Sequence, residues 1–338
     1  MKIIFLPILC FLISLMSSAQ ETKYLPEHRG KWIYTNENTS GEWFDEKFYK
    51  MDAGEILQYH KTTERLMKYF SGQPISQNPI GVDLKSHART MYNHYDHERY
   101  PVIASERIKA KLLIQFCPLL ELQGKTESFC DEVPYLDVIT NYPRATYEPG
   151  MNITLLNNLD VCNKMLEMFY LPDTLMNLGN GVILYKWYYE NRAVIAGNKR
   201  PYWIPVTTKE YIERTLNYYN ESIKEGNTEQ QMVLDALKKE IALVLPGQMN
   251  KPVYISNDMP DRPLLGICDK GESGAKALCK FNPNYFDSTL PKMDVQLITI
   301  TIPGHTDHAD DPDISSKNVW DFIKGLDGKD LLGLLDVN

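Results

Sequence analysis

Two short clusters of histidine and aspartate carry the residue types that could bind a metal ion. One contains His305, Asp307 and His308, and the other contains His94 and His97. Imidazole and carboxylate groups bind zinc or non-haem iron when three or more ligands converge. A transition metal held in this way would lower the pKa of a bound water and so supply the nucleophile of a hydrolase.

The competing interpretation is that both clusters are solvated loops, because each lies in a polar, turn-like segment. The two clusters are far apart in the sequence, so a joint site would require distant segments to meet. The second cluster follows a β-branched segment that ends at Pro303-Gly304. Loops at strand ends often carry function, which makes this cluster the better candidate of the two.

An aromatic row offers a different kind of chemistry. Tyr185, Trp187 and Tyr189 alternate along a strand-like segment, so their side chains would share one face. An exposed row of this kind could stack on sugar rings, as in a carbohydrate-binding module. Aromatic residues are also favoured in strands, and the competing interpretation is that this face packs against a helix near 208–225.

Five cysteines follow the N-terminal segment, and their spacing suggests two local disulfides. We predict bonds between Cys117 and Cys130 and between Cys268 and Cys279, with Cys162 unpaired. The second pair brackets a turn-forming run of Asp, Gly and Ser residues. Other pairings remain open, as does the alternative that all five are small buried residues.

The N-terminal segment resembles bacterial secretory signals. Lys2 precedes an apolar run, and small residues lead up to Ala19. The apolar run is shorter than the about 20 residues that a membrane-spanning helix needs. We therefore predict a signal peptide at 1–19 and an exported chain at 20–338, periplasmic or secreted, with no transmembrane segment after cleavage. Disulfides persist in those compartments.

Charge and missing motifs exclude several functions. The net charge is −8, and loss of Lys2 makes it one unit more negative, so the surface repels the phosphates of nucleic acids. The sequence lacks the metalloprotease His-Glu-x-x-His, the hydrolase Gly-x-Ser-x-Gly, a phosphate-binding loop and Cys-x-x-Cys. The leading prediction is non-catalytic binding of an unknown protein or glycan partner. The alternatives are a metal-dependent hydrolase and a carbohydrate-binding module.

The elements that must position these residues come in separate groups of strands and helices. Hydrophobic periodicity and capping residues predict a helix at 53–71 and an antiparallel helix pair near 208–245. Further elements are expected as follows: a strand at 101–116 that ends before Pro118, a helix at 160–171, a hairpin at 182–195 turning near Glu190-Asn191, a strand at 295–302, and short helices after Ser315. This order predicts an α+β fold with a mainly antiparallel sheet, and the candidate domain boundary is at 197–205.

Overall fold

The computed structural model describes most of the chain after the N-terminal segment. The described residues are 23–35, 53–90, 107, 109–131, 133–142, 168–186, 190–197, 200–256, 259–303 and 314–336. The predicted signal peptide lies outside them and stays a prediction. In the described part of the chain, no helix combines the length and the apolar character needed to cross a bilayer.

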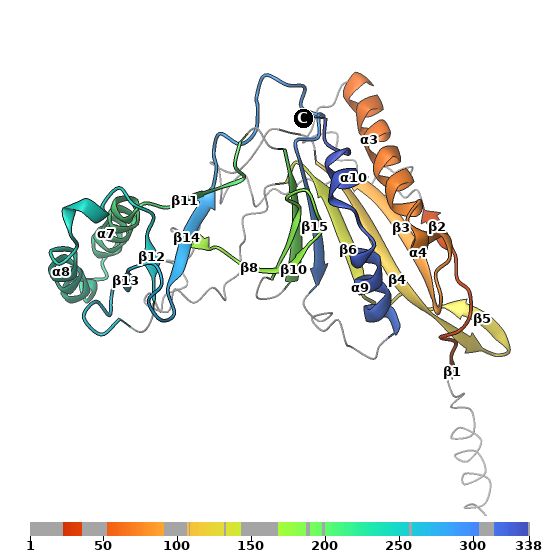
Figure 1. The fold of residues 1–338 in the computed structure, drawn as a ribbon, viewed down its shortest axis with the longest axis horizontal. Coiled ribbons are helices and arrows are strands. Elements are labelled where there is room, and N and C mark those ends of the chain that lie inside the picture. The colour runs from red at the N-terminus through yellow and green to blue at the C-terminus, as the bar shows by residue number, and fades with distance from the viewer. Residues whose placement is uncertain are drawn as a thin grey trace, which may run out of the picture.

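A large, mainly antiparallel sheet forms the centre of the molecule (Figure 1). Its strands run in the order β2 (Trp32–Thr35), β3 (Val82–Thr90), β4 (Ala110–Leu122), β6 (Tyr135–Thr140), β15 (Leu297–Pro303), β10 (Glu190–Ala196), β9 (Ile183–Lys186) and β8 (Asp173–Asn177). Strand β2 is parallel to β3, and the other neighbours in this order are antiparallel. The end of β4 also pairs with β1 (Lys23–Tyr24) and β5 (Lys125–Ser128).

Helices cover one face of the large sheet (Figure 1). They are α3 (Ala53–Ser71), α4 (Pro74–Gln77), α9 (Ile314–Lys324) and α10 (Gly328–Leu332). Alternate β4 residues Leu112, Ile114 and Phe116 are buried in the core beneath them, where the Phe116 ring meets Phe322 edge-on at 5.7 Å. The predicted helices at 53–71 and after Ser315 are confirmed, because their apolar stripes pack on this sheet.

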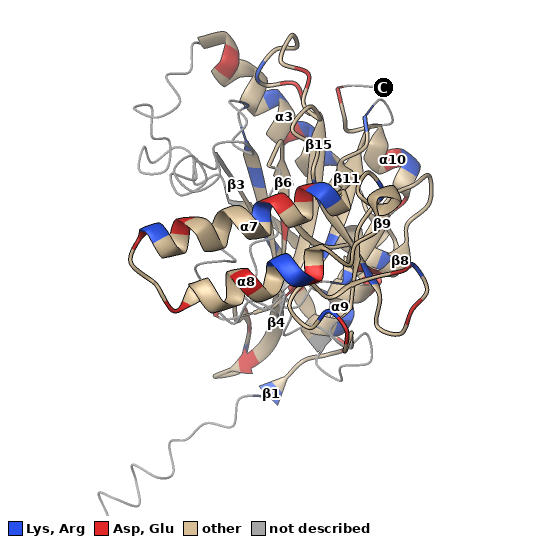
Figure 2. Cartoon of the chain, turned by 90° about the vertical axis from the view of Figure 1, so that its left-hand side faces the viewer, with Lys and Arg blue, Asp and Glu red and all other residues tan. Residues whose placement is uncertain are grey.

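A smaller sheet carries the helix pair. Its order is β11 (Trp203–Pro205), β14 (Lys276–Phe281), β12 (Tyr254–Ile255) and β13 (Ile267–Cys268), and β7 (Phe169–Tyr170) also pairs with β14. Helices α7 (Thr208–Lys224) and α8 (Gln230–Ile241) lie side by side (Figure 2) and are followed by a short 3-10 helix at Pro246–Gln248. Thr207 caps α7 by accepting a hydrogen bond from the Glu210 N–H. The α+β prediction and the helix pair are confirmed.

An aromatic cluster joins the two sheets. Tyr202 and Tyr285 are buried together with Val194 and Leu297 of the large sheet, and Trp203 and Phe281 of the small sheet pack against them. The chain passes from β10 to β11 at the predicted boundary, 197–205, and returns to the large sheet at β15. Whether the two sheets are independent domains stays a prediction.

Three predicted elements differ from the structure. Strand β4 continues through Pro118 because the pairing changes there: Pro118 lies opposite Val82 of β3, and the next residues pair with β1 and β5. The helix predicted at 160–171 is wrong at Phe169–Tyr170, which form strand β7. Glu190 and Asn191 belong to strand β10 rather than to a turn, although the β9–β10 hairpin itself is confirmed.

Candidate functional site

The face of the large sheet opposite its helices carries a set of buried and half-buried polar side chains. Side chains alternate between the two faces of a strand, so Lys111 and Gln115 of β4 point away from the core that buries Leu112 and Ile114. The same alternation holds on the neighbouring strands. We call this surface the polar face, and it consists of His87, Lys111, Gln115, Asp137, Glu190, Arg192, Thr299 and Thr301.

Strand register aligns several of these residues in one row. Arg192 lies opposite Thr301, and Thr301 lies opposite Asp137. Asp137 in turn faces Leu113, which faces His87. Residues directly opposite each other in an antiparallel pair have Cβ atoms about 4.5–5.5 Å apart, so neighbours along the row are within reach of one another or of one small molecule.

Two buried ion pairs lie on the polar face. Lys111 Nζ lies 2.5 Å from Asp137 Oδ2, and each side chain is 11% exposed. Arg192 pairs with Glu190 two residues earlier on the same strand, with exposures of 3% and 11%. Buried charges are tolerated when each is paired with an opposite charge, and these two pairs each join one cation to one carboxylate.

Two polar atoms in the centre of the row lack hydrogen-bond partners. Asp137 Oδ1 and Thr301 Oγ1 are both buried, and neither has a partner among the described residues. The two residues are only 8% and 3% exposed, and they are direct cross-strand neighbours. A buried polar atom without a partner destabilises the fold, so a pair of them side by side makes this position the candidate functional site.

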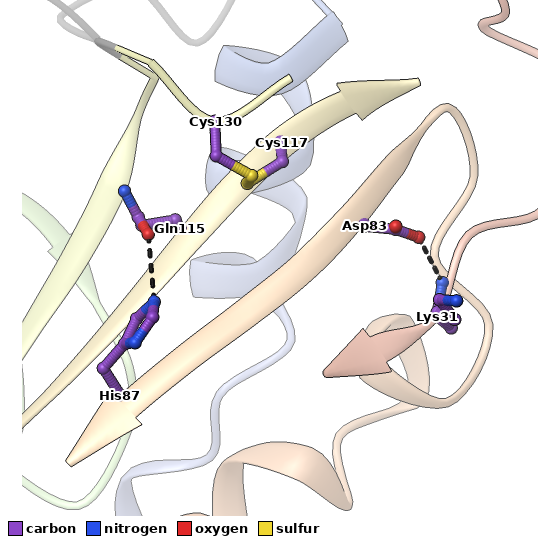
Figure 3. Close-up of a disulfide and its surroundings, with 6 residues drawn as sticks. All are labelled: Lys31, Asp83, His87, Gln115, Cys117 and Cys130. Carbon is purple, nitrogen blue, oxygen red and sulfur yellow. Dashed lines mark hydrogen bonds between the residues drawn. A yellow bond between two sulfur atoms is a disulfide. The ribbon is translucent and has the colours of Figure 1, made fainter. Parts of the chain in front are cut away.

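The polar face ends at a hydrogen bond and a disulfide (Figure 3). The His87 ring lies 3.2 Å from Gln115 Oε1, with Nε2 as the donor in the tautomer that makes this bond. Cys117, two residues beyond Gln115 on the same face, is bonded to Cys130 with an S–S distance of 2.05 Å. The predicted Cys117–Cys130 disulfide is confirmed, and it ties the segment that follows β5 to β4.

The other predicted disulfide is wrong, because Cys268 and Cys279 are not bonded to each other. Cys268 lies on β13 and Cys279 on β14, and β12 lies between these strands. Two strand spacings amount to roughly 9.5 Å, beyond the about 7 Å between Cα atoms that a disulfide can bridge. Burial raises the pKa of each thiol to about 11.

Tyr185 extends the row at the other end, opposite Arg192. Its ring lies 4.8 Å from that of Trp203 in an edge-on contact, so the strand packs on β11 rather than on a helix. Burial raises the pKa of the nearby Tyr202 hydroxyl to about 12, and the charge of Arg192 opposes this effect. Trp187 and Tyr189 lie outside the described residues, so the aromatic row stays a prediction.

The predicted metal ligands His94, His97, His305, Asp307 and His308 also lie outside the described residues. The strands that lead into the two clusters run in opposite directions. Strand β3 therefore ends at Thr90 at one end of the sheet's strands, and β15 ends at Pro303 at the opposite end. The described part of the chain contains no group of three or more His, Cys, Asp or Glu side chains arranged to hold a metal.

Comparison of the chain with protein-family models, with curated proteins and with solved structures gives no match. The residues of the polar face were not among the sequence-based candidates. One signal was available: Thr299 and Thr301 alternate with Ile298, Ile300 and Ile302, a pattern of one polar and one apolar face. That pattern marks a polar face but cannot show which strands complete it.

Proposed function

We propose that this protein is an exported, non-catalytic binding protein whose ligand contacts the polar face of the large sheet. The observation that carries the proposal is the pair of unpartnered, buried polar atoms, Asp137 Oδ1 and Thr301 Oγ1, on adjacent strands. Polar groups in protein interiors are nearly always hydrogen-bonded, so this pair favours a bound molecule.

Export is supported by two independent features. The segment 1–19 has the order of charge, apolar run and small residues typical of a secretory signal. The Cys117–Cys130 disulfide is the kind of bond that persists outside the reducing cytoplasm.

Binding is favoured over catalysis by the way the charges are held. Lys111 and Arg192 each contact a carboxylate, which fixes both cations and both anions in place. A general acid or base has to exchange its proton during turnover, and a group committed to a buried ion pair is poorly suited to that role.

The test is a ligand screen on residues 20–338 by thermal shift, repeated with Thr301→Val. Valine has nearly the same shape as threonine but no hydroxyl, so the variant removes an unpartnered polar atom. We expect unchanged or slightly raised stability without ligand, by up to about 1 kcal/mol, together with loss of the ligand-induced shift.

Thr126→Val is the matched control, because Thr126 is an exposed strand residue on β5, away from the polar face. A Thr301→Val variant that is clearly destabilised and still responds fully to ligand would show that the hydroxyl serves the fold alone, and the proposal would be wrong.

A further inference from the structure

We infer that the ligand is a neutral, hydroxyl-rich molecule, a saccharide or a related polyol, held by Asp137 and Thr301. This inference rests on the function proposed above and adds the chemical class of the ligand. It is based on three properties of the polar face: its charge balance, the kinds of hydrogen bond its unpartnered atoms can make, and the residues beside them.

The charge balance disfavours an ionic ligand. Lys111 is matched by Asp137, and Arg192 is matched by Glu190. A phosphate or carboxylate ligand would have to compete with these carboxylates for the cations, and an ammonium ligand would have to compete with Lys111 for Asp137. A neutral molecule can bind without breaking either ion pair.

The unpartnered atoms select for hydroxyl groups. Asp137 Oδ1 in the ion pair accepts hydrogen bonds only, whereas Thr301 Oγ1 both donates and accepts. One hydroxyl, or two on neighbouring carbons, can donate to Asp137 and accept from Thr301 at the same time. A ketone or ether oxygen can only accept, so it would leave Asp137 Oδ1 without a donor.

The neighbours in the row suit the carbon skeleton of a polyol. Leu113 lies directly opposite Asp137 on the same face and is only partly buried, so it offers an apolar contact for C–H groups. Because Asp137 and Thr301 are almost fully buried, a bound molecule would be enclosed.

The experiment is a calorimetric titration of residues 20–338 with matched sets of probes. The neutral set contains glucose, galactose, mannose, xylose and their short oligomers, with glycerol and inositol. The charged set contains glucuronate, glucosamine and inorganic phosphate. We expect binding from the neutral set, weakened at least tenfold by Thr301→Val and by Asp137→Asn, and unchanged in Thr126→Val.

A folding check accompanies the Asp137 variant, because Asp137→Asn leaves Lys111 without its carboxylate. The double variant Lys111→Met/Asp137→Asn contains no unmatched charge at this position, and we expect it to fold and still to bind the neutral probe at least tenfold more weakly.

Three outcomes separate the inference from the function on which it rests. Binding of a charged probe alone, lost in Thr301→Val, would overturn the neutral class and leave the binding function standing. Binding of a neutral probe that Thr301→Val does not weaken would overturn this site. If no probe binds, and a crystal structure shows a water bridging Asp137 and Thr301, both proposals are wrong.

Discussion

Lys111 of β4 and Asp137 of β6 form a buried ion pair across two adjacent strands, and their contact runs diagonally, since Asp137 faces Leu113 and Lys111 faces Ile139. Asp137 also carries one of the two unpartnered atoms of the polar face, and its cross-strand neighbour Thr301 carries the other. The energetic role of the ion pair therefore decides how the site can be altered without unfolding the sheet.

Breaking this pair on one side should destabilise the protein. Lys111→Met leaves the Asp137 carboxylate buried without its cation, and we expect a loss of about 3–5 kcal/mol in the free energy of unfolding. Lys111→Met/Asp137→Leu removes both charges and should be close to the original stability. Urea unfolding of the two single variants and the double variant measures the coupling. A Lys111→Met variant within about 1 kcal/mol of the original would contradict the buried pair.

The Cys117–Cys130 disulfide should contribute measurably to stability. It closes a short loop, with a sequence separation of 13 residues, and we expect Cys117→Ser/Cys130→Ser to lower the free energy of unfolding by about 3 kcal/mol. Unfolding with and without reductant provides the control: the original protein should lose stability in reductant, and the double variant should not respond.

The thiols of Cys268 and Cys279 should be present but slow to react. Because burial raises the pKa of each to about 11, only about one thiol in ten thousand is ionised near pH 7. In a Cys162→Ser variant of residues 20–338, an aromatic disulfide reagent should react slowly with the folded protein and titrate two thiols after denaturation. A count of zero after denaturation would restore the disulfide that the strand order excludes.

The raised pKa of Asp294 predicts that removing its charge increases the stability of the protein in a pH-dependent way. Burial, followed by the charge of Asp336, raises its pKa above the ordinary 3.8, while Arg107 and Arg65 oppose the shift. The folded protein thus binds this proton more tightly than the unfolded chain. Proton binding by Asp294 therefore stabilises the folded protein fully below the pKa of the unfolded chain, and this stabilisation is lost as the pH rises through the folded pKa.

Asp294→Asn should therefore raise the melting temperature at pH 7 and give no gain near pH 3. Asp235→Asn, on the exposed side of α8, is the control for removing a carboxylate elsewhere on the protein. A lower melting temperature for Asp294→Asn at pH 7 would mean that the attraction of Arg107 and Arg65 outweighs burial.

The metal hypothesis remains testable on the predicted ligands. If His305, Asp307 and His308 hold a transition metal, plasma mass spectrometry of gel-filtered protein should find it in stoichiometric amount. His305→Ala should then lose the metal, while His28→Ala, in a different part of the chain, should keep it. Metal-free protein that binds none on addition of zinc or iron would reject this alternative.

Sequence reasoning predicted the elements whose signal is local. The helix at 53–71, the helix pair and one disulfide follow from hydrophobic period, capping residues and short spacing. It was wrong at Phe169–Tyr170, because that strand exists only through pairing with β14, more than a hundred residues later. Partners at that distance override local preference.

The candidate site could not be predicted for the same reason. Asp137, Thr301, Arg192 and Lys111 come from four strands, and none belongs to a motif of fixed spacing. Only the register of β15 between β6 and β10 makes Thr301 a neighbour of both Asp137 and Arg192. The lack of partners for Asp137 Oδ1 and Thr301 Oγ1 is a property of the folded sheet and leaves no signal in the sequence.

The pairing of β10 with β15 also has a consequence for how the chain can be rearranged. Ala196 lies opposite Leu297, so the whole segment that builds α7, α8 and most of the small sheet leaves and re-enters the large sheet at one point, as a hairpin loop would. Loop-closure entropy grows only with the logarithm of length, so a tenfold longer loop costs about 2 kcal/mol more. That position behaves as an insertion point, where evolution or an engineer can exchange the inserted segment while the large sheet keeps its register.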